Sequence, residues 1–364
     1  MKTPIYVWII LTVSLLAGSV SAQSETASWE RAVSLYTQNQ YRESIVEFKK
    51  VLAEFPTHSD SWKYAGLAQF QIKEYESAIE SLTRALELKS AEGQNDLDIL
   101  PALSRSHLSL NHFQLAIPYL ETLNQKYPEV ANNHYLLGFA YANLNRLKEA
   151  ATELKAAVKL DPKDSGTWYY LGVVSLKSNQ LDDAISSFRN GYAAAPNNLD
   201  ILNLLAETLV RKGLKESDSA KANSIYDEAV KIATRLKSLK DDGDSAELLG
   251  RIYLAAKKYT SAELTLSRAL VLTKEPPATL YFNLGFAHAQ NKSWSRAAEM
   301  LLKADKLNPA NADTLNYLGF VYENLQKYSL AMDAYTKAFE ASGRTNAEIK
   351  AAMERISVSL KAQR

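Results

Sequence analysis

The sequence contains no cysteine among its 364 residues. Without cysteine a protein forms no disulfide bond, and it has no thiolate to attack a substrate or bind a soft metal ion. A lipid anchor of the lipoprotein type is also excluded, since no cysteine follows the N-terminal apolar segment. Disulfide scaffolds and thiol enzymes are therefore ruled out for this chain.

An excess of charge of one sign is also missing. The chain has 42 Lys and Arg residues against 41 Asp and Glu residues, and no stretch concentrates the basic ones. Nucleic-acid-binding proteins usually present a basic stripe that neutralises phosphates. We therefore predict a mixed-charge surface and no nucleic-acid partner.

Long hydrophobic runs are scarce, and the one that occurs lies at the N-terminus. Lys2 precedes an apolar run over residues 5–16, and small residues follow it up to Ser21 and Ala22. This order is typical of a secretory signal peptide, here cleaved after Ala22. The alternative is an uncleaved membrane anchor, because residues 5–20 approach the length of a short membrane-spanning helix.

The N-terminal pattern predicts an exported protein. We expect residues 1–22 to be the signal peptide, and we expect membrane contact only through this segment if it is not cleaved. A single short signal and the absence of cysteine favour the bacterial periplasm or envelope, although secretion elsewhere also fits.

Residue patterns for catalysis are absent as well. The five histidines include no pair four residues apart with a glutamate between them, which a zinc protease needs. The chain has no G-x-S-x-G turn and no glycine-rich phosphate loop. We therefore predict that the protein is not an enzyme and uses no metal or small-molecule cofactor.

What the sequence does contain is a repeat. Small residues recur at intervals of 34 to 40 residues, at Ser44, Ala78, Ala116, Ala150, Ala184, Ala222, Ala262, Ala297 and Ala331. Four residues after each stands a large apolar residue, and seven after it a mostly small one. Positions 0, +4 and +7 share one face of an α-helix, so each interval is predicted to contain a helix with a buried stripe.

Another helix is predicted upstream of the helix with the buried stripe in each repeat. Its marker is a glycine after Leu or Ala, at Gly66, Gly138, Gly172, Gly250, Gly285 and Gly319. Prolines fall twelve residues after five of the small residues, at Pro56, Pro128, Pro162, Pro196 and Pro309, where a helix must stop. The unit is therefore a helix, a short turn, a second helix and a proline-marked turn.

The small residues Gly138 and Ala150 need a reason, because glycine inside a helix costs roughly 1 kcal/mol relative to alanine. We interpret them as contact points. The missing side chain of Gly138 on the first helix receives the second helix, so that the two backbones approach closely.

The pattern resembles the tetratricopeptide repeat family, whose unit carries W-x2-L-G-x2-Y, then A-x3-F, then P. Residues 165–196 give the best copy, with Trp168, Leu171, Gly172, Ala184, Phe188 and Pro196. The resemblance implies an all-α fold, a right-handed α-solenoid of about nine tetratricopeptide-type helix-turn-helix repeats over residues 23–344. We expect a C-terminal capping helix over residues 345–364, since Ile349, Met353 and Ile356 lie on one helical face.

Some copies depart from the pattern. Arg31-Ala32 replaces the Leu-Gly pair in the first copy, and Leu205-Ala206 replaces it in the sixth. The sixth copy also has four extra residues, which we place between its helices near residues 211–221. We interpret residues 90–98, 211–221 and 237–244 as surface loops, with hinges between groups of repeats as the alternative. His107 and His288 stand where other copies have tyrosine, so we expect packed core histidines.

In this family the first helix of each repeat lines the concave side, so the resemblance implies that partners bind there. Residues one and two past the Trp-type position, and one past the glycine, point away from the packing stripe. The predicted partner-binding set on the concave face is Tyr64, Tyr135, Phe139, Tyr169, Tyr170, Phe282, Asn283, Phe286, Asn316, Tyr317 and Phe320. The alternative is that these rings fill a tight superhelix by touching adjacent repeats.

The best-known ligand mode of the family is a clamp of Lys, Arg and Asn that binds a terminal carboxylate. Lys63 matches one clamp position, but Leu67 stands where the asparagine is expected and Ala102 replaces the next basic residue. The sequence therefore argues against this clamp. Aromatic rings beside asparagines favour burial of apolar side chains with hydrogen bonds to an extended peptide backbone.

Together these features predict a non-catalytic scaffold or adaptor of the cell envelope that binds a protein or peptide partner in its concave groove. The alternative is a repeat arm that recruits the enzymes of a polysaccharide synthesis or export assembly.

Overall fold

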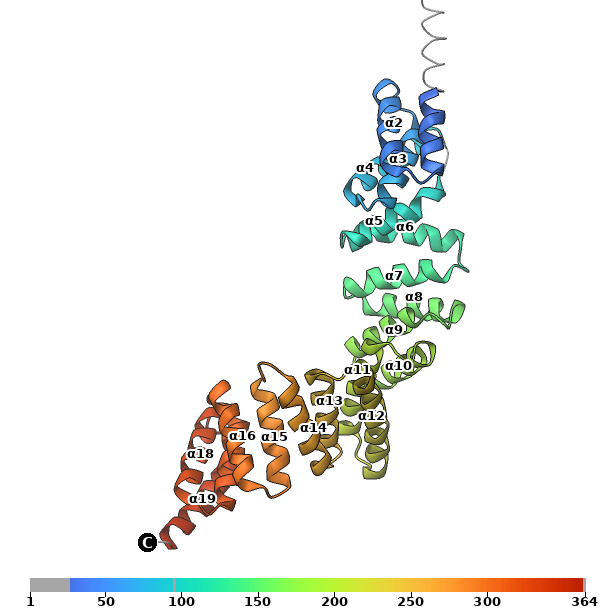
Figure 1. The fold of residues 1–364 in the computed structure, drawn as a ribbon. Helices are drawn as coiled ribbons and strands as arrows, with labels where there is room; N and C mark the ends of the chain where they lie inside the picture. Colours follow the sequence, from blue (N-terminus) through green and yellow to red (C-terminus); the bar gives the residue numbers. More distant parts are fainter. Residues whose placement is uncertain (1–26, 94–95, 363–364) are drawn as a thin grey trace, which may run out of the picture. The chain divides into compact units, whose positions relative to one another are not determined.

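The computed structural model describes residues 27–93 and 96–362 (Figure 1). The predicted signal peptide therefore lies outside the described residues. All regular structure within them is helical. A first helix covers residues 27–37, and it is followed by α2 (Tyr41–Glu54), α3 (Ser59–Gln71), α4 (Tyr75–Ala91), the short 3-10 helix η1 (Leu97–Ile99), α5 (Leu100–Ser109), α6 (Phe113–Lys126), α7 (Ala131–Asn143), α8 (Leu147–Leu160) and α9 (Ser165–Lys177).

The chain divides inside α9 into two compact units, one ending at Val174 and one starting at Ser175. The second unit contains α10 (Leu181–Ala194), α11 (Leu199–Lys215), α12 (Ser219–Leu239), α13 (Gly243–Ala255), α14 (Tyr259–Leu272), α15 (Ala278–Gln290), α16 (Trp294–Leu307), α17 (Ala312–Asn324), α18 (Tyr328–Ala341) and α19 (Ala347–Ala362). None of the three polar stretches proposed as alternative hinges coincides with this division.

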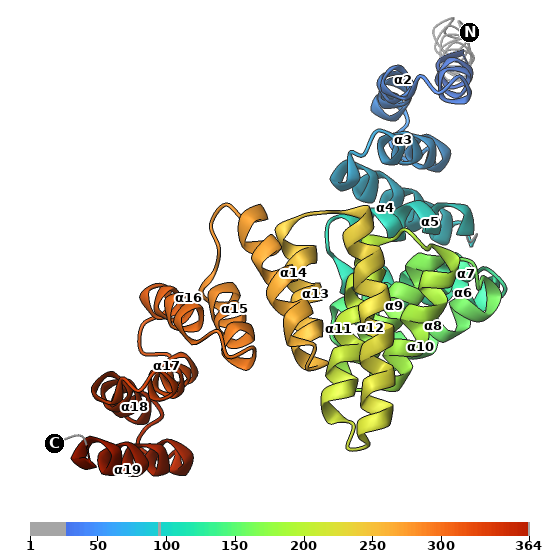
Figure 2. The same ribbon diagram turned by 60° about the horizontal axis from the view of Figure 1, so that its bottom comes forward.

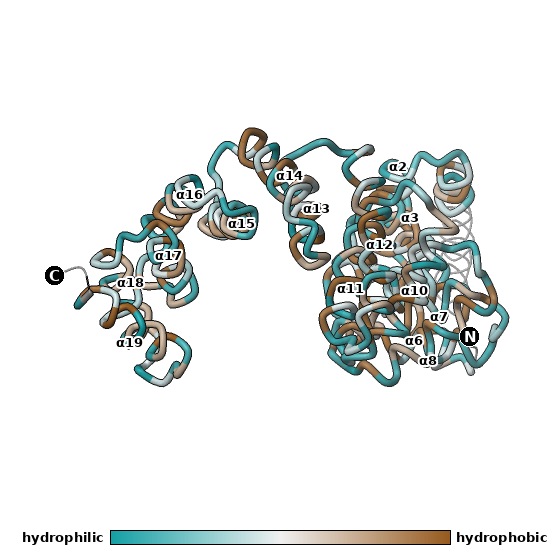
Figure 3. The backbone as a smooth tube through the Cα atoms, turned by 90° about the horizontal axis from the view of Figure 1, so that it is seen from below, coloured by the Kyte–Doolittle hydropathy of each residue, from teal (hydrophilic) through white to brown (hydrophobic). Residues whose placement is uncertain are grey.

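The helices form consecutive antiparallel pairs, and each pair is one of the predicted repeats. Helices α3 and α4, α7 and α8, and α17 and α18 contact each other directly, and neighbouring pairs also meet, for example through α4 and α5, α6 and α7, and α14 and α15. Apolar and polar segments alternate along the helices that can be followed in Figure 3, such as α12, α14 and α16, which is the pattern of one buried stripe per helix. The predicted all-α solenoid of helix-turn-helix repeats is confirmed.

The stripe that defines the repeat is buried throughout. Eight of the nine small residues have no exposed surface, and Ala222 is also buried. At Gly138, an ideal Cβ would lie 2.7 Å from Leu154 Cγ and 3.2 Å from the Ala150 carbonyl oxygen. Equivalent contacts join Gly66 to Leu82 and Gly285 to Leu301. The interpretation that the glycine lets the second helix approach closely is therefore confirmed. We call the contact between this glycine and the large apolar residue of the second helix a glycine clasp.

The prolines end helices as predicted. Helices α2, α6 and α8 end two residues before Pro56, Pro128 and Pro162. In each case the residue between is the C-cap. A proline cannot donate the next helical hydrogen bond, and it restricts the residue before it to extended conformations.

The turns between the two helices of a repeat share a backbone feature that the sequence did not predict. One residue in most of these turns has a positive φ between 56° and 64°, namely Asn39, Lys73, Asn111, Asn145, Asn179, Lys257, Lys292 and Gln326. Asparagine tolerates this left-handed region better than lysine or glutamine does. The turn geometry is therefore imposed by helix packing, even where the residue is unfavourable.

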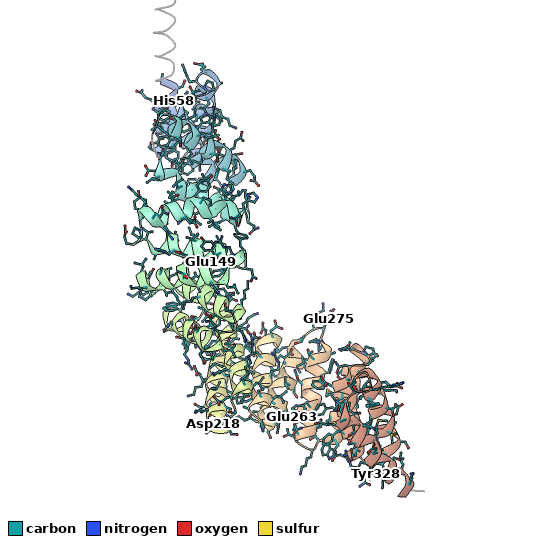
Figure 4. All side chains as sticks on the ribbon, turned by 180° about the vertical axis from the view of Figure 1, so that it is seen from behind. His58, Glu149, Asp218, Glu263, Glu275 and Tyr328 are labelled. Atoms are coloured by element: carbon teal, nitrogen blue, oxygen red, sulfur yellow. The ribbon has the colours of Figure 1, made fainter. Side chains whose placement is uncertain are left out.

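The sixth repeat corrects the sequence analysis. Its extra residues do not lie between the helices: they lengthen α11 to 17 residues and α12 to 21, against 13 and 14 in α13 and α14 (Figure 2). Only residues 216–218 separate α11 from α12. Asp218 begins α12 by accepting hydrogen bonds from the backbone N–H groups of Ala220 and Lys221, at 2.8 and 3.1 Å (Figure 4).

A glycine that the sequence analysis overlooked supports the longer helices. Leu205 and Ala206 are fully buried, but the clasp is made two turns later, where an ideal Cβ at Gly213 would lie 2.6 Å from Tyr226 Cε1. The point of closest approach has thus moved toward the end of α11. This shift allows the helix to continue beyond the usual length.

Helix α19 covers the last repeat. Ile349, Ala352 and Ile356 are buried in the same cluster as Leu318 and Tyr335 of α17 and α18. Arg355 adds a two-pronged hydrogen bond to Glu323, with N–O distances of 2.7 and 2.9 Å. The C-terminal helix therefore shields an apolar surface that would otherwise face water.

Candidate protein-binding grooves

The first helices of neighbouring repeats touch one another. Direct contacts join α3 to α5 in the first unit, and α11 to α13, α13 to α15 and α15 to α17 in the second. Within each unit these helices therefore form a layer of their own, and we call it the first-helix layer. In each unit one groove is open along this layer.

The first groove, the α5–α7 groove, lies in the first unit and has a volume of about 410 Å³. Its lining comes from α3, α4, α5 and α7 and consists of Phe70, Tyr75, Arg105, Leu108, Ser109, Asn132, Tyr135, Leu136 and Phe139. The lining is mainly apolar, with an exposed guanidinium and an exposed amide beside it. Two residues of the predicted binding set, Tyr135 and Phe139, belong to it.

The second groove, the α11–α13 groove, lies in the second unit and has a volume of about 360 Å³. Its lining comes from α11, α13 and α15 and consists of Glu207, Val210, Arg211, Leu214, Leu248, Arg251, Ile252, Leu254, Ala255 and Asn283. Asn283 is the one member of the predicted binding set found there. Leu214 stands on the extra turn of α11 and is 67% exposed.

Most of the other predicted aromatic residues pack against rings of a neighbouring repeat. In the first unit, Tyr170 of α9 contacts Tyr135 and Phe139 of α7, with ring centroids 5.8 and 5.1 Å apart. Tyr169 contacts Tyr170 edge to face, and Tyr64 lies among Trp29, Tyr36 and Phe48 near the N-terminus. The rings therefore fill space between repeats, the alternative role.

The second unit repeats this arrangement. Tyr317 of α17 contacts Phe282 and Phe286 of α15, with centroids 5.7 and 5.1 Å apart. Phe320 contacts Trp294 and remains 39% exposed, and Asn316 is half-buried. All of these rings keep part of their surface in solvent. Packing between repeats is thus observed, while partner binding by the predicted set stays a prediction.

Lys63, the candidate clamp residue, already has a partner. Its Nζ lies 2.8 Å from Asp96 Oδ2 and 3.7 Å from Asp98 Oδ2. Ala102 is buried. The chain's own carboxylates thus neutralise the lysine, which agrees with the argument against a terminal-carboxylate clamp.

Most of the residues that line the grooves were not predicted from the sequence. Phe70, Leu108, Val210 and Leu254 each lie four residues after the glycine-type position of their repeat, one helical turn beyond the position that was used. Continuing the stripe by one turn would have found them. Arg105 was missed because Leu103-Ser104 replaces the Leu-Gly marker in its repeat.

The two histidines at tyrosine-type positions are buried, as predicted. Burial lowers the pKa of His107, and the neighbouring His112 adds to the effect. Burial also lowers the pKa of His288, although the Glu263 carboxylate, 3.5 Å from its Nδ1, opposes the shift. Both side chains therefore resist protonation in the folded chain.

We expect this resistance to make the protein acid-sensitive. A histidine with a lowered pKa in the folded chain binds protons preferentially after unfolding, so the free energy of unfolding falls as the pH drops from about 7 through the ordinary histidine pKa of about 6.5. The free energy of unfolding stops falling once the pH is below the lowered pKa of these histidines in the folded chain. The double variant His107→Tyr/His288→Tyr should flatten this profile in urea unfolding at a series of pH values. An equally steep profile would contradict the assignment.

In residues 27–93 and 96–362 no three His, Asp or Glu side chains come close enough to hold a metal ion. No helix in the same residues combines the length and the apolar character needed to cross a bilayer.

Family models match most of the chain. Models of the tetratricopeptide repeat match residues 30–93, 102–165 and 247–312, and two further models of this repeat match residues 153–186 and 312–344. These ranges cover all or most of each helix that lines the grooves, apart from α11.

Two curated proteins and one solved structure are similar to parts of this chain. The BBSome complex member BBS4 of Bos taurus is 27% identical over 301 residues, covering 81% of this chain and 54% of that protein. The DnaJ homolog subfamily C member 7 homolog of Dictyostelium discoideum is 24% identical over 200 residues, covering 51% and 31%. The chain thus spans about half the length, or less, of these curated relatives. A crystal structure of the APC/C hetero-tetramer Cut9-Hcn1 covers 91% of this chain and 63% of that one, with 17% identity and a TM-score of 0.46.

Proposed function

Since the chain belongs to the tetratricopeptide repeat family, we propose that it binds a segment of a partner protein along its first-helix layer and has no catalytic activity of its own. A tetratricopeptide repeat fold is a scaffold for protein–protein interaction, and this much follows from the family. The finer proposal concerns where the partner lies. It is carried by one observation, that in each unit a groove opens among the first helices of the repeats.

The lining of the grooves supports a peptide as the occupant. Each groove combines apolar side chains with an asparagine amide, Asn132 in one and Asn283 in the other. Apolar side chains bury the side chains of a bound segment, and amides hydrogen-bond to its backbone. The exposed parts of the aromatic rings extend this surface along the layer.

The setting of the protein is also part of the proposal. We place the scaffold in the bacterial cell envelope, on the strength of the N-terminal sequence pattern. The name of its BBSome relative supports a place within a multi-protein assembly.

In-cell photocrosslinking of the full chain tests the site. We expect Tyr169→Ala and Phe286→Ala to reduce capture of partner proteins several-fold, since interface aromatics contribute much of the binding energy. Helical content and the melting temperature should change little. The matched controls are Leu115→Ala and Leu264→Ala, which remove exposed leucines from the second helices α6 and α14.

The outcome separates the two roles of the rings. Equal capture by all four variants would contradict binding along the first-helix layer. A loss of capture that merely follows a loss of fold would leave the rings with a packing role alone. Mass spectrometry of the captured proteins would identify the assembly, and enzymes of polymer synthesis among them would point to a polysaccharide assembly.

A further inference from the structure

Three arginines of the described residues differ from the others in having no side-chain partner. In the part of the chain that the structure describes, every arginine except three makes an ion pair or a hydrogen bond with another side chain. Arg189, for example, binds both oxygens of the Glu228 carboxylate, at 2.8 and 2.6 Å. The three exceptions are Arg105, Arg211 and Arg251, which are exposed and have no such partner within residues 27–93 and 96–362. All three line the grooves of the first-helix layer.

The α11–α13 groove contains two of them. Arg211 comes from α11 and Arg251 from α13, so adjacent repeats contribute one guanidinium each. Glu207 and Glu247 stand one helical turn before the two arginines, yet neither carboxylate comes within the 4.0 Å of an ion pair with them. Burial instead raises the pKa of Glu247, with the Arg251 charge opposing. The guanidinium groups therefore remain available to a ligand.

Apart from Glu207 and Asn283, the rest of this groove is apolar. Leu248, Ile252 and Leu254 come from α13, and Leu214 comes from the turn by which α11 exceeds an ordinary first helix. A leucine that is 67% exposed beside a groove leaves apolar surface in water. An apolar side chain from a partner would cover it.

We infer that the α11–α13 groove binds an acidic protein segment that carries an apolar side chain between carboxylates. This inference rests on the proposed function and names the chemistry of the partner. A planar guanidinium binds a carboxylate through two parallel hydrogen bonds, and an unpaired pair of them across a groove favours a negatively charged occupant. The α5–α7 groove also combines arginine with apolar side chains, but it has a single arginine, Arg105, beside Phe70 and Leu108.

Selection from random dodecapeptides displayed on phage tests the inference with the full chain. We expect the wild type to select peptides that combine Asp or Glu with Leu or Phe. A selected peptide, synthesised with an amidated C-terminus, should bind at least about tenfold more weakly to Arg211→Glu/Arg251→Glu in fluorescence anisotropy. The charge-reversed variant should itself select basic peptides.

A matched control keeps the net charge change equal. Arg235→Glu/Arg296→Glu reverses two exposed arginines on the second helices α12 and α16 and should retain wild-type affinity. Circular dichroism verifies the fold of each variant. If the glutamate variant fails to fold, Arg211→Gln/Arg251→Gln takes its place, with weaker binding of the acidic peptide as the expected result.

Three results would overturn the inference. Selection of neutral or basic peptides by the wild type would do so, as would acidic peptides whose affinity is unaffected by the two arginines. So would arginine-dependent binding of a single-stranded oligonucleotide or of phosphatidylglycerol vesicles without any preference for acidic peptides. In all three cases the photocrosslinking along the first-helix layer could still succeed, so the failure of the inference is distinct from that of the proposed function.

Discussion

Replacing Gly138 with leucine is expected to lower the free energy of unfolding by about 1–3 kcal/mol or more. The reason is the clasp in the fourth repeat, where even a Cβ would lie 2.7 Å from Leu154 Cγ. That atom is close to its own backbone, so it cannot swing aside as the tip of a long side chain could. The backbone of Ala150, with its oxygen 3.2 Å from the same point, closes the other side. Urea unfolding followed by circular dichroism measures the loss.

The same helix offers a control. Asn132→Leu adds a leucine to α7 at an exposed position and should change the free energy of unfolding by no more than about 0.5 kcal/mol. Similar stabilities for the two leucine variants would refute the clasp. A partial rescue of Gly138→Leu by Leu154→Ala would support it, because the smaller residue restores the lost space.

Replacing Ile356 with aspartate is expected to cost about 3 kcal/mol or more and to expose the end of the second unit. Ile356 is 0% exposed and lies within the cluster that α19 forms with α17 and α18. A carboxylate there would lose its hydration without gaining a partner. The variant should aggregate more readily, since an uncovered terminal repeat presents its apolar face to water.

A neighbouring position provides the comparison. Val358 is on the same helix and is 69% exposed, so Val358→Asp adds the same charge without burying it. We expect the valine variant to keep wild-type stability and solubility in thermal melts and size-exclusion chromatography. Equal damage from both substitutions would mean that charge on α19, rather than its packing, is responsible.

The repeats were predictable from the sequence because their contacts are local. The stripe that begins at Ala150 and the glycine at position 138 lie in one repeat, so a single regularity in the sequence describes both the helix and its packing. The buried histidines followed from the same register. Residues that pack only within a repeat leave a periodic signal, and that signal was strong.

The grooves were not predictable in the same way. Whether an arginine is paired depends on residues a repeat away, as for Arg189 and Glu228 or for Lys63 and Asp96. The extension of α11 depends on the contact between Tyr226 and Gly213. The repeat pattern instead placed this contact at Ala206, the usual glycine-type position. Contacts between repeats carry no fixed spacing, so the site had to come from the structure.

The glycine clasp has a consequence for how the chain can change in evolution. In the second, fourth and eighth repeats both partners of the clasp, such as Gly66 and Leu82, belong to a single repeat. Duplicating or deleting one whole repeat would therefore preserve every remaining clasp, and the gene could alter the length of the protein in steps of one repeat. The sixth repeat is the exception. Its longer α11 lines one groove together with α13 and α15 of the next two repeats. Deleting a repeat from this segment would therefore remove a binding groove as well as shorten the chain.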